Sequence, residues 1–559
     1  MRNRLLTPLA VLATLTLVLG ACGSDGDDRG NDSTAKDSIE NTEVEDHRGE
    51  AEVTIRVTDN LFTPQNVRVD PGTKIVFDNQ GRNIHEIGAF GGDGFGLGFG
   101  INQIKVGAKY EFTFAEPGTY RYFCVLHGSN VVGMIGAVVV GDGELESVAT
   151  DPTDGQATGT LRVPQDHPTI QAAVDAAAPG SLVLIDKGVY HEAVTVNPGH
   201  ENIVIRGVDR NETILDGEFD EDLPNAFKVL ADGVAIENLT ARNYSTNAFF
   251  WTGVDGYRGS YLTSLRTGDY GIYSFDSVNG EFDHDYAAGS ADAGYYIGQC
   301  YPCNAVLRDS VAEWNGLGYS GTNAGGELYL VNNVFRYNRA GIVPNSGNGE
   351  ANPPERETTI VGNLVHDNDN GFTPAIDIAL VAQGFGIINA GGRDNVIERN
   401  LVIGHRYGIV LAIQPEAPEY ASIGNTVRDN VVEESSYTDL GLIADPADEN
   451  CFAGNDFTTS YPPEIETVQP CEGEPATELT GVDTLTAQIL GTVDHNPPSI
   501  EAATAALPDP PVLENMPDAL TAPPVPATGD SVPSTVDLAA IQVPAAPTNR
   551  AEIDPGIQP

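Results

Sequence analysis

LRDSVAEW (residues 307–314) and VNNVFRYN (331–338) are two copies of one short pattern that decides the fold of most of the chain. Each copy joins apolar residues to a pair of polar ones, and a strand-like segment such as AGIVPN follows it. Three earlier segments, IENLTARN, GSYLTSLR and FDHDYAAG, repeat the pattern. Aligning the five segments puts these residues at one position, 23 or 24 residues apart: Asn238, Tyr261, Asp285, Asp309 and Asn333.

A repeat of this length, built from short strands and turns, is typical of the coils of a parallel β-helix. Each coil buries its inward face only by stacking on its neighbours. Later copies continue at wider steps, which indicate loop insertions, at Asn363, Asn400 and Asn430. The recurrent asparagines predict a ladder of amides bonded from coil to coil. We expect a short helix at residues 168–177 to cap the first coil.

The chain divides around these repeats, which we assign to residues 159–472. Residues 51–143 contain short alternating strands with Pro-Gly and Gly-rich turns, a pattern typical of a small β-sandwich. Polar segments at 23–50 and 144–158 are predicted linkers, and the Pro/Ala-rich residues 473–559 are a predicted disordered tail. The sequence therefore predicts an all-β protein of two domains.

The charge and the first residues indicate where the protein works. There are 80 acidic residues against 29 Lys and Arg, and a net charge of −51 repels nucleic acid. Residues 1–22 have the charged start and apolar run of an export signal, and they end in LGAC at Cys22. LGAC resembles the lipobox of bacterial lipoproteins, which implies lipidation of Cys22; the alternative is an ordinary secretory signal. We expect an exported protein, bound to the membrane through this lipid, at the outer face of the cell membrane or in the periplasm.

Five cysteines follow Cys22 and would face an oxidising compartment. Cys300 and Cys303 fit a structural disulfide, although a redox pair or a metal knuckle is an alternative. Cys451 and Cys471 fit a second disulfide that closes the last coil. Cys124 is the odd cysteine.

Cys124 lies in YRYFCVLHGSNVVGM (120–134), which also contains His127 and Met134. A thiolate, two imidazoles and a distant thioether are the ligands of a blue-copper site. The second imidazole is His85, in NQGRNIHEIG, and residues 51–143 contain no histidine besides His85 and His127. The alternatives are a buried thiol with a solvated loop histidine, or a zinc site.

These two stretches resemble the cupredoxin family, specifically its plastocyanin-like members, over residues 51–143. The resemblance implies a Greek-key β-sandwich, one type 1 copper and electron transfer to a redox partner protein. It also implies that His85, Cys124 and His127 are equatorial ligands and that Met134 is the weak axial ligand. Six residues separate His127 from Met134, more than in plastocyanins. The resemblance therefore does not fix the distance from copper to the Met134 sulfur.

The repeats resemble the right-handed parallel β-helices of pectin-lyase-like proteins, including polysaccharide lyases and epimerases. They also resemble the periplasmic copper protein that assists maturation of nitrous-oxide reductase. We expect the β-helix to bind a partner or a cell-surface polysaccharide. The first alternative is a carbohydrate lyase, epimerase or hydrolase, with Asp283 and Asp285 as catalytic candidates because they would project on one side of a strand. A ladder or turn role for Asp285 competes with this. The second alternative is copper delivery, which the presence of only three methionines disfavours.

Overall fold

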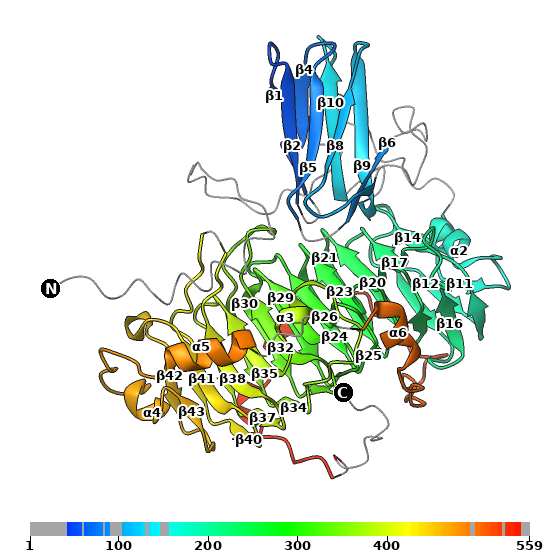
Figure 1. The fold of residues 1–559 in the computed structure, drawn as a ribbon. Helices are drawn as coiled ribbons and strands as arrows, with labels where there is room; N and C mark the ends of the chain where they lie inside the picture. The colour runs from blue at the N-terminus through cyan, green and yellow to red at the C-terminus, as the bar shows by residue number, and fades with distance from the viewer. Residues whose placement is uncertain are drawn as a thin grey trace. The chain divides into compact units, whose positions relative to one another are not determined.

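The computed structural model describes residues 42–58, 61–81, 84–89, 103–128, 133–145, 156–416, 418–491, 498–527, 532–548 and 550. The regular secondary structure of the described residues is mostly β-strand, which confirms the all-β prediction, and the chain forms two compact units (Figure 1). The first unit is N-terminal and the second contains the repeats. The predicted export signal and its Cys22 lie outside the described residues. Within the described part of the chain, no helix has the length and apolarity that crossing a membrane requires.

The N-terminal unit is a sandwich of two sheets. Alternate residues of β2 are buried, because successive side chains of a strand point to opposite faces. One sheet has the order β1-β4-β10-β9-β6-β7 and the other β3-β2-β5-β8, and one hydrophobic core draws residues from both. The described strands are β1 Glu45–Asp46, β2 Glu52–Thr58, β3 Leu61–Thr63, β4 Asn66–Val69, β5 Lys74–Asn79, β6 His85–Ala89, β7 Gln103–Ile104, β8 Lys109–Thr113, β9 Gly118–Gly128 and β10 Gly133–Val140.

The sandwich begins earlier than the sequence indicates. Strand β1 pairs in parallel with β4, although sequence analysis assigns Glu45 and Asp46 to the linker 23–50. His47 continues the contact, since its backbone N–H donates to the carbonyl of Arg68 over 2.8 Å. Composition does not reveal this strand, because backbone groups make the pairing and the two acidic side chains are exposed.

The second unit winds three parallel sheets around one core, one strand of each sheet per coil. Sheet 1 contains β11 Thr160–Val163, β12 Leu182–Ile185, β15 Val204–Gly207, β18 Val234–Glu237, β21 Asp255–Ser260, β24 Val278–Asp283, β27 Ala305–Arg308, β30 Gly325–Val331, β33 Arg356–Val361, β36 Val396–Glu398, β39 Thr426–Arg428 and β42 Cys451–Ala453. Sheet 2 contains β13 Gly188–Tyr190, β16 Thr213–Asp216, β19 Thr240–Arg242, β22 Thr263–Leu265, β25 Tyr286–Ala288, β28 Val311–Glu313, β31 Val334–Arg336, β34 Leu364–His366, β37 Leu401–Ile403 and β40 Val431–Glu433. Sheet 3 contains β14 Val194–Val196, β17 Asn225–Val229, β20 Asn247–Thr252, β23 Ile272–Phe275, β26 Ala293–Gly298, β29 Leu317–Thr322, β32 Ala340–Asn345, β35 Phe385–Ala390, β38 Tyr407–Ala412, β41 Thr438–Ile443 and β43 Ser460–Tyr461.

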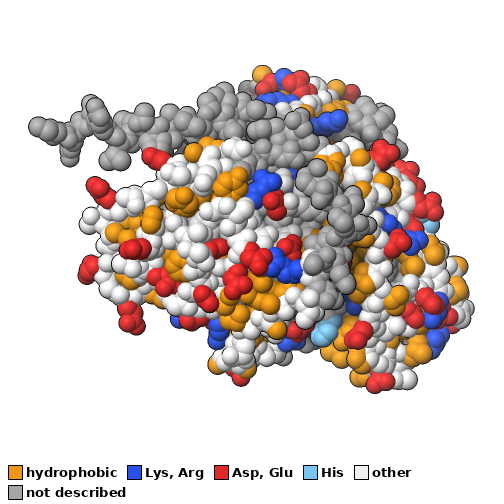
Figure 2. Space-filling view, turned by 60° about the horizontal axis from the view of Figure 1, so that its bottom comes forward, with side chains coloured by type: hydrophobic (Ala, Val, Ile, Leu, Met, Phe, Trp, Pro, Cys, Tyr) orange, Lys and Arg blue, Asp and Glu red, His pale blue; other side chains and the backbone are white. Residues whose placement is uncertain are grey.

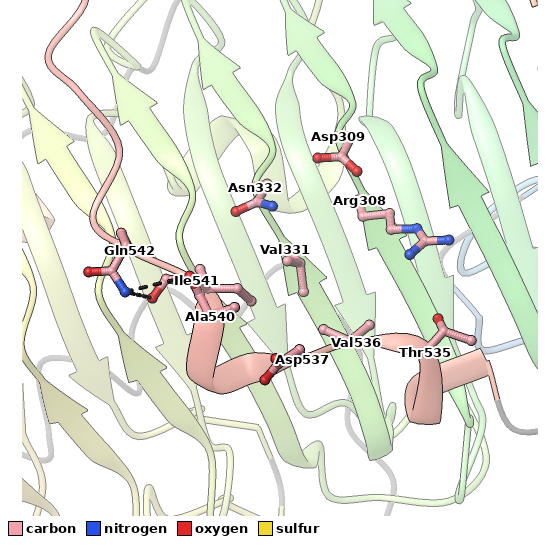
Figure 3. Close-up of a pocket in the computed structure, with 10 residues that line it drawn as sticks. All are labelled: Arg308, Asp309, Val331, Asn332, Thr535, Val536, Asp537, Ala540, Ile541 and Gln542. Atoms are coloured by element: carbon pink, nitrogen blue, oxygen red, sulfur yellow. Dashed lines mark hydrogen bonds between the residues drawn. The ribbon is translucent and has the colours of Figure 1, made fainter.

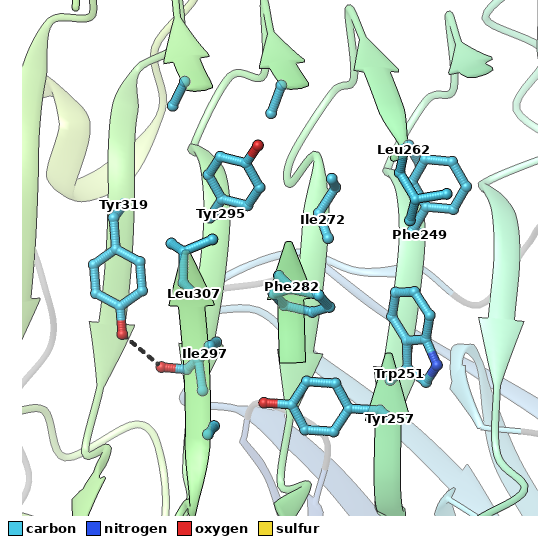
Figure 4. Packing of buried hydrophobic residues seen from close by; sticks show 14 of the residues in the cluster. Phe249, Trp251, Tyr257, Leu262, Ile272, Phe282, Tyr295, Ile297, Leu307 and Tyr319 are labelled. Carbon is cyan, nitrogen blue, oxygen red and sulfur yellow. Dashed lines mark hydrogen bonds between the residues drawn. The ribbon is translucent and has the colours of Figure 1, made fainter. Parts of the chain in front are cut away.

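The inside of the coils is a continuous apolar core. Figure 4 shows Trp251, Tyr257 and Phe282 packed together, and the Phe282 ring centroid lies 5.6 Å from that of Trp251 and 5.3 Å from that of Tyr257. Rings of neighbouring coils also stack in parallel, as Phe227 and Phe249 do. Stacking of coils therefore supplies the burial that no single coil provides.

An asparagine ladder runs along the turn between sheets 1 and 2. The backbone N–H of each ladder residue donates to the side-chain oxygen of the next, over 2.9 to 3.1 Å, through Asn333, Asn363, Asn400, Asn430 and Asn455. The ladder confirms the prediction for the later coils. The alignment of the five earlier segments is correct for two of its residues, since Asp285 and Asn333 are in the ladder. The other three lie one residue before the ladder and have a left-handed backbone conformation: Asn238, Tyr261 and Asp309.

Short helices cover the ends of the β-helix and parts of the outer faces of sheets 1 and 3. Thr169 caps α2 by accepting a hydrogen bond from the N–H of Ala172, and Ile170 and Val174 are buried against the first coil. The described helices are α2 Ile170–Ala176, α3 Asp377–Val381, α4 Ile465–Val468, α5 Val482–Gly491 and α6 Ile500–Ala505, with the 3-10 helices η3 Pro446–Asp448, η4 Val532–Thr535 and η5 Leu538–Ala540.

The C-terminal region differs from the predicted disordered tail 473–559. Leu485 of α5 is fully buried on the outer face of sheet 3. Further on, an extended segment lies on the β-helix, where the Arg206 guanidinium donates to the carbonyl of Ala522 over 2.7 Å. Composition does not predict this contact, because main-chain carbonyls of the tail make it.

Candidate metal centre

Neighbouring strands of the larger sandwich sheet bring the predicted ligands together. His85 is the first residue of β6 and is fully buried. Strand β6 pairs antiparallel with β9, with Ile87 opposite Cys124. His127 follows Cys124 by three residues on β9, so one strand supplies both side chains.

A register shift between β9 and β10 positions Met134. Gly133 pairs with Gly128 and Ile135 pairs with Phe123, so Met134 faces the segment from Cys124 to His127. Gly133 has φ +89°, a conformation that glycine adopts without a Cβ clash. Met134 is fully buried in the same core cluster as Cys124.

The donor atoms of His85, Cys124 and His127 form a buried triangle. Sγ of Cys124 lies 3.7 Å from Nδ1 of His85 and 3.3 Å from Nδ1 of His127, and the two nitrogens are 3.1 Å apart. An ion at the centre of such a triangle would be about 2 Å from each donor, the usual length of a metal–nitrogen bond. The residues therefore fit a metal ion bound by one thiolate and two imidazoles.

The surroundings of Cys124 favour its thiolate. Burial raises the pKa of the Cys124 thiol, but the charge and hydrogen bond of His127, together with His85, outweigh burial and hold this pKa well below its usual value. The backbone N–H of Glu86 also donates to Sγ, over 3.4 Å. The amino-acid sequence does not indicate this N–H donor, because the pairing of β6 with β9 brings it to the sulfur.

The four side chains form a type 1 copper site, with Met134 as the thioether of the set. Within the described residues, His85, Cys124 and His127 are the one group of three His, Cys, Asp or Glu side chains close enough to share an ion. The zinc alternative fits less well, since a buried thioether beside a single thiolate is typical of copper.

The side chains of Asp283 and Asp285, the two catalytic candidates of the β-helix, do not project from the same side of a strand. Asp283 ends β24 on the outer face of sheet 1, and its Oδ2 accepts a hydrogen bond from Nδ1 of His284 over 2.8 Å. Asp285 is buried in the ladder, where its Oδ1 accepts from the N–H of Leu262 over 2.7 Å. Burial, and then the charge of Asp283, raise the pKa of Asp285 well above its usual value. The geometry therefore differs from the expected acid and base pair and agrees with the ladder role of Asp285.

Two disulfides join the cysteines that the sequence paired: Cys300 with Cys303, and Cys451 with Cys471. Cys124 is the free cysteine of the described residues. Disulfides of this kind persist in extracytoplasmic compartments.

Residues 50–141 match the model of the copper binding proteins of the plastocyanin/azurin family. The major isoform of chloroplast plastocyanin from Arabidopsis thaliana is 32% identical over 88 residues, which are 14% of this chain and 51% of that protein. Plastocyanin A/B of Petroselinum crispum is 33% identical over 87 residues, 14% of this chain and 87% of that protein. The chain thus spans 51% of the first relative and 52% of a plastocyanin from Silene latifolia subsp. alba.

Solved structures similar to the chain include the A-module of a mannuronan C-5 epimerase from Azotobacter vinelandii. Its TM-score is 0.36 at 14% identity, and the match covers 54% of this chain and 92% of the module. The catalytic unit of an alpha-1,3-glucanase from Streptomyces thermodiastaticus has a TM-score of 0.37 at 13% identity, covering 64% of this chain and 76% of that unit.

Proposed function

The chain belongs, through residues 50–141, to the plastocyanin/azurin family of copper-binding proteins, and on this premise we propose that it is an exported electron carrier. Its partner would be a redox protein outside the cytoplasm. The observation that carries the proposal is the buried triangle of His85, Cys124 and His127 beside Met134.

Copper bound in this site supplies one-electron redox chemistry. The protein's part is to hold the donors in place. His85 and Cys124 come from paired strands, and Met134 is fixed by the register of β9 and β10, so the ligands keep their positions when the charge of the site changes. The Glu86 N–H donates to the sulfur and stabilises its negative charge.

For the β-helix we propose binding of a partner or a cell-surface glycan. Its outer faces support this role, because stacked coils offer a long rigid surface that carries charged side chains and inserted loops. Figure 2 shows acidic side chains spread over the face in view, with Lys and Arg less frequent. Such a surface favours an extracellular ligand over nucleic acid.

Attachment through a lipid on Cys22 completes the proposal. It is supported by the sequence LGAC after an apolar run, and the two disulfides agree with a site outside the cytoplasm. The lipid would keep the copper domain near membrane redox proteins.

The test is to load the soluble chain with copper and record its visible spectrum. We expect an intense sulfur-to-copper band, and we expect Cys124→Ser to abolish it because serine supplies no thiolate. Ser310→Ala, in the β-helix, should leave the band unchanged. A wild-type chain that binds copper without the band would overturn the electron-transfer proposal.

A further inference from the structure

The C-terminal strap, residues 513–527 and 532–548, begins at sheet 2, where Leu513 packs, and continues along sheet 1 of the β-helix. It is held at one end by arginines: Nη1 of Arg206 donates to the carbonyls of Ala522 and Ala519, over 2.7 and 3.2 Å. Arg258 donates to the carbonyl of Val525 over 2.7 Å. Both guanidinium groups also pair with the buried carboxylate of Glu237. Charged hydrogen bonds from a rigid sheet therefore fix this end of the strap.

A second anchor holds the chain beyond the strap. Nη2 of Arg550 lies 3.0 Å from Oδ1 of Asp367, and its Nη1 lies 2.9 Å from Oε2 of Glu434. Between the anchors, Ile541 is buried against Val331 and Val361. The strap is thus fixed before and after its middle part.

Beside this buried contact, the middle part of the strap and sheet 1 leave a pocket of 440 Å³ between them (Figure 3). Protein sites for small ligands typically enclose about 300 to 1,000 Å³. One wall comes from sheet 1 and its turn, and the other from the strap; the lining residues are Arg308, Asp309, Val331, Asn332, Thr535, Val536, Asp537, Ala540, Ile541 and Gln542.

The lining combines an apolar floor with a polar rim. Val331, Val536 and Ile541 form one hydrophobic cluster. Asp309 and Asn332 occupy the left-handed position of the turn, and within the described residues their side chains make no hydrogen bond to protein. Gln542 adds an amide that donates, among the residues that the structure describes, to carbonyls of its own segment. The rim therefore offers both donors and acceptors to a ligand.

A sugar ring has the complementary chemistry, because its hydroxyls donate and accept hydrogen bonds around an apolar face. The charges in the pocket favour a neutral sugar. Arg308 is already paired with Glu281, and the carboxylates of Asp309 and Asp537 face the same space, so an acidic sugar would be repelled.

We propose that this pocket binds one neutral sugar ring of an extended glycan, with the strap as its second wall. The inference rests on the proposed role of the β-helix in glycan binding and gives that role a site and a ligand class. Carboxylates at the rim accept hydrogen bonds from sugar hydroxyls, while Val536, which is only partly buried, contacts the ring face.

The test titrates the full chain with neutral glucose and mannose hexasaccharides and with a hexauronate of equal length. We expect a neutral hexasaccharide to bind and the hexauronate to bind at least about tenfold more weakly. Asp309→Ala and Asp537→Asn should each weaken binding of the neutral ligand about tenfold, since each removes a charged acceptor. Asparagine keeps the side-chain oxygen with which Asp537 caps η5, where it accepts from the N–H of Ala539 over 3.2 Å. Glu514→Ala removes an exposed carboxylate of the strap outside the pocket and is the matched control, with unchanged affinity.

Bound sugar should also slow proteolytic cleavage of the strap in the wild type but not in Asp309→Ala. If the wild type and both pocket variants bound the sugar with equal affinity, the proposal that the sugar lies in this pocket would be wrong. Glycan binding at another place on the β-helix would still stand. Absence of binding by every neutral hexasaccharide, or stronger binding of the hexauronate, would overturn the ligand class. The copper band reports separately on the electron-carrier proposal, because none of these variants lies in the N-terminal unit.

Discussion

Glu355 is a fully buried carboxyl group in the β-helix. Its Oε2 accepts hydrogen bonds from Nδ2 of Asn389 and of Asn395, both over 2.9 Å. Burial raises its pKa from 4.5 to about 7, against the opposing effect of these amides. The folded protein therefore holds this proton more tightly than the unfolded chain does. The resulting stabilisation is complete below about pH 4.5 and is lost as the pH rises through about 7, a change of at most about 3 kcal/mol.

We predict that Glu355→Gln abolishes this part of the pH dependence, because glutamine accepts the same amide hydrogen bonds without ionising. The measurement is the free energy of unfolding in urea at about pH 5 and about pH 8. From the lower to the higher pH, the free energy of unfolding of the wild type should fall by more than that of the variant. The exposed Glu357→Gln is the control and should follow the wild type. Parallel pH curves for Glu355→Gln and the wild type would contradict the prediction.

The copper ligands could be predicted because few residue types bind copper and their order along the strands is restrictive. The positions of Asp283 and Asp285 could not. His284 has φ +57°, and this one left-handed residue ends the alternation of β24, turning Asp285 into the ladder. Asn238 and Tyr261 take the same conformation in other coils, so no residue type marks the position.

At the scale of elements, the asparagine ladder joins the coils. Asn400 is fully buried; its Nδ2 donates to the carbonyl of Ile360 over 2.9 Å, and its Oδ1 accepts from the N–H of Asn363 over 2.9 Å. Asn400→Ala removes these two hydrogen bonds, and those with the side chains of Asn363 and Asn430, in the dry interior. We expect a loss of about 2 to 5 kcal/mol in the free energy of unfolding. Asn455→Ala, at the partly exposed end of the ladder, should cost less because water can replace the amide. Equal losses, measured by urea unfolding, would argue against a role of burial.

The existence of the repeating strands could be predicted from their pattern, but their register could not. Ser260 of β21 pairs with Asp283, 23 residues later, whereas Asp283 pairs with Arg308, 25 residues later. An alignment by equal steps therefore drifts by one residue. Pairing depends on how much chain each turn absorbs, and that length varies from coil to coil.

At the scale of the whole molecule, the change from sandwich strands to repeats predicted two domains, and the structure has two compact units. The strap could not be predicted in the same way. Its Pro-rich composition indicates disorder, yet Ala519, Ala522 and Val525 use main-chain carbonyls to bind arginines of sheet 1. Every residue has such a carbonyl, so the contact leaves no sequence signature.

The separate cores of the two units lead to a prediction about the whole chain. All residues of the sandwich core lie between Val53 and Val140, and the copper ligands lie within the same range. We therefore expect calorimetry to show two unfolding transitions. Copper should raise the midpoint temperature of only one of them. Ligand at about a hundred times its Kd stabilises the binding unit by about 2.7 kcal/mol. Cys124→Ser should remove this rise in midpoint temperature. Asn400→Ala should lower the midpoint temperature of the β-helix transition alone. If copper raised both transitions equally, the two units would unfold as one and the prediction would be wrong.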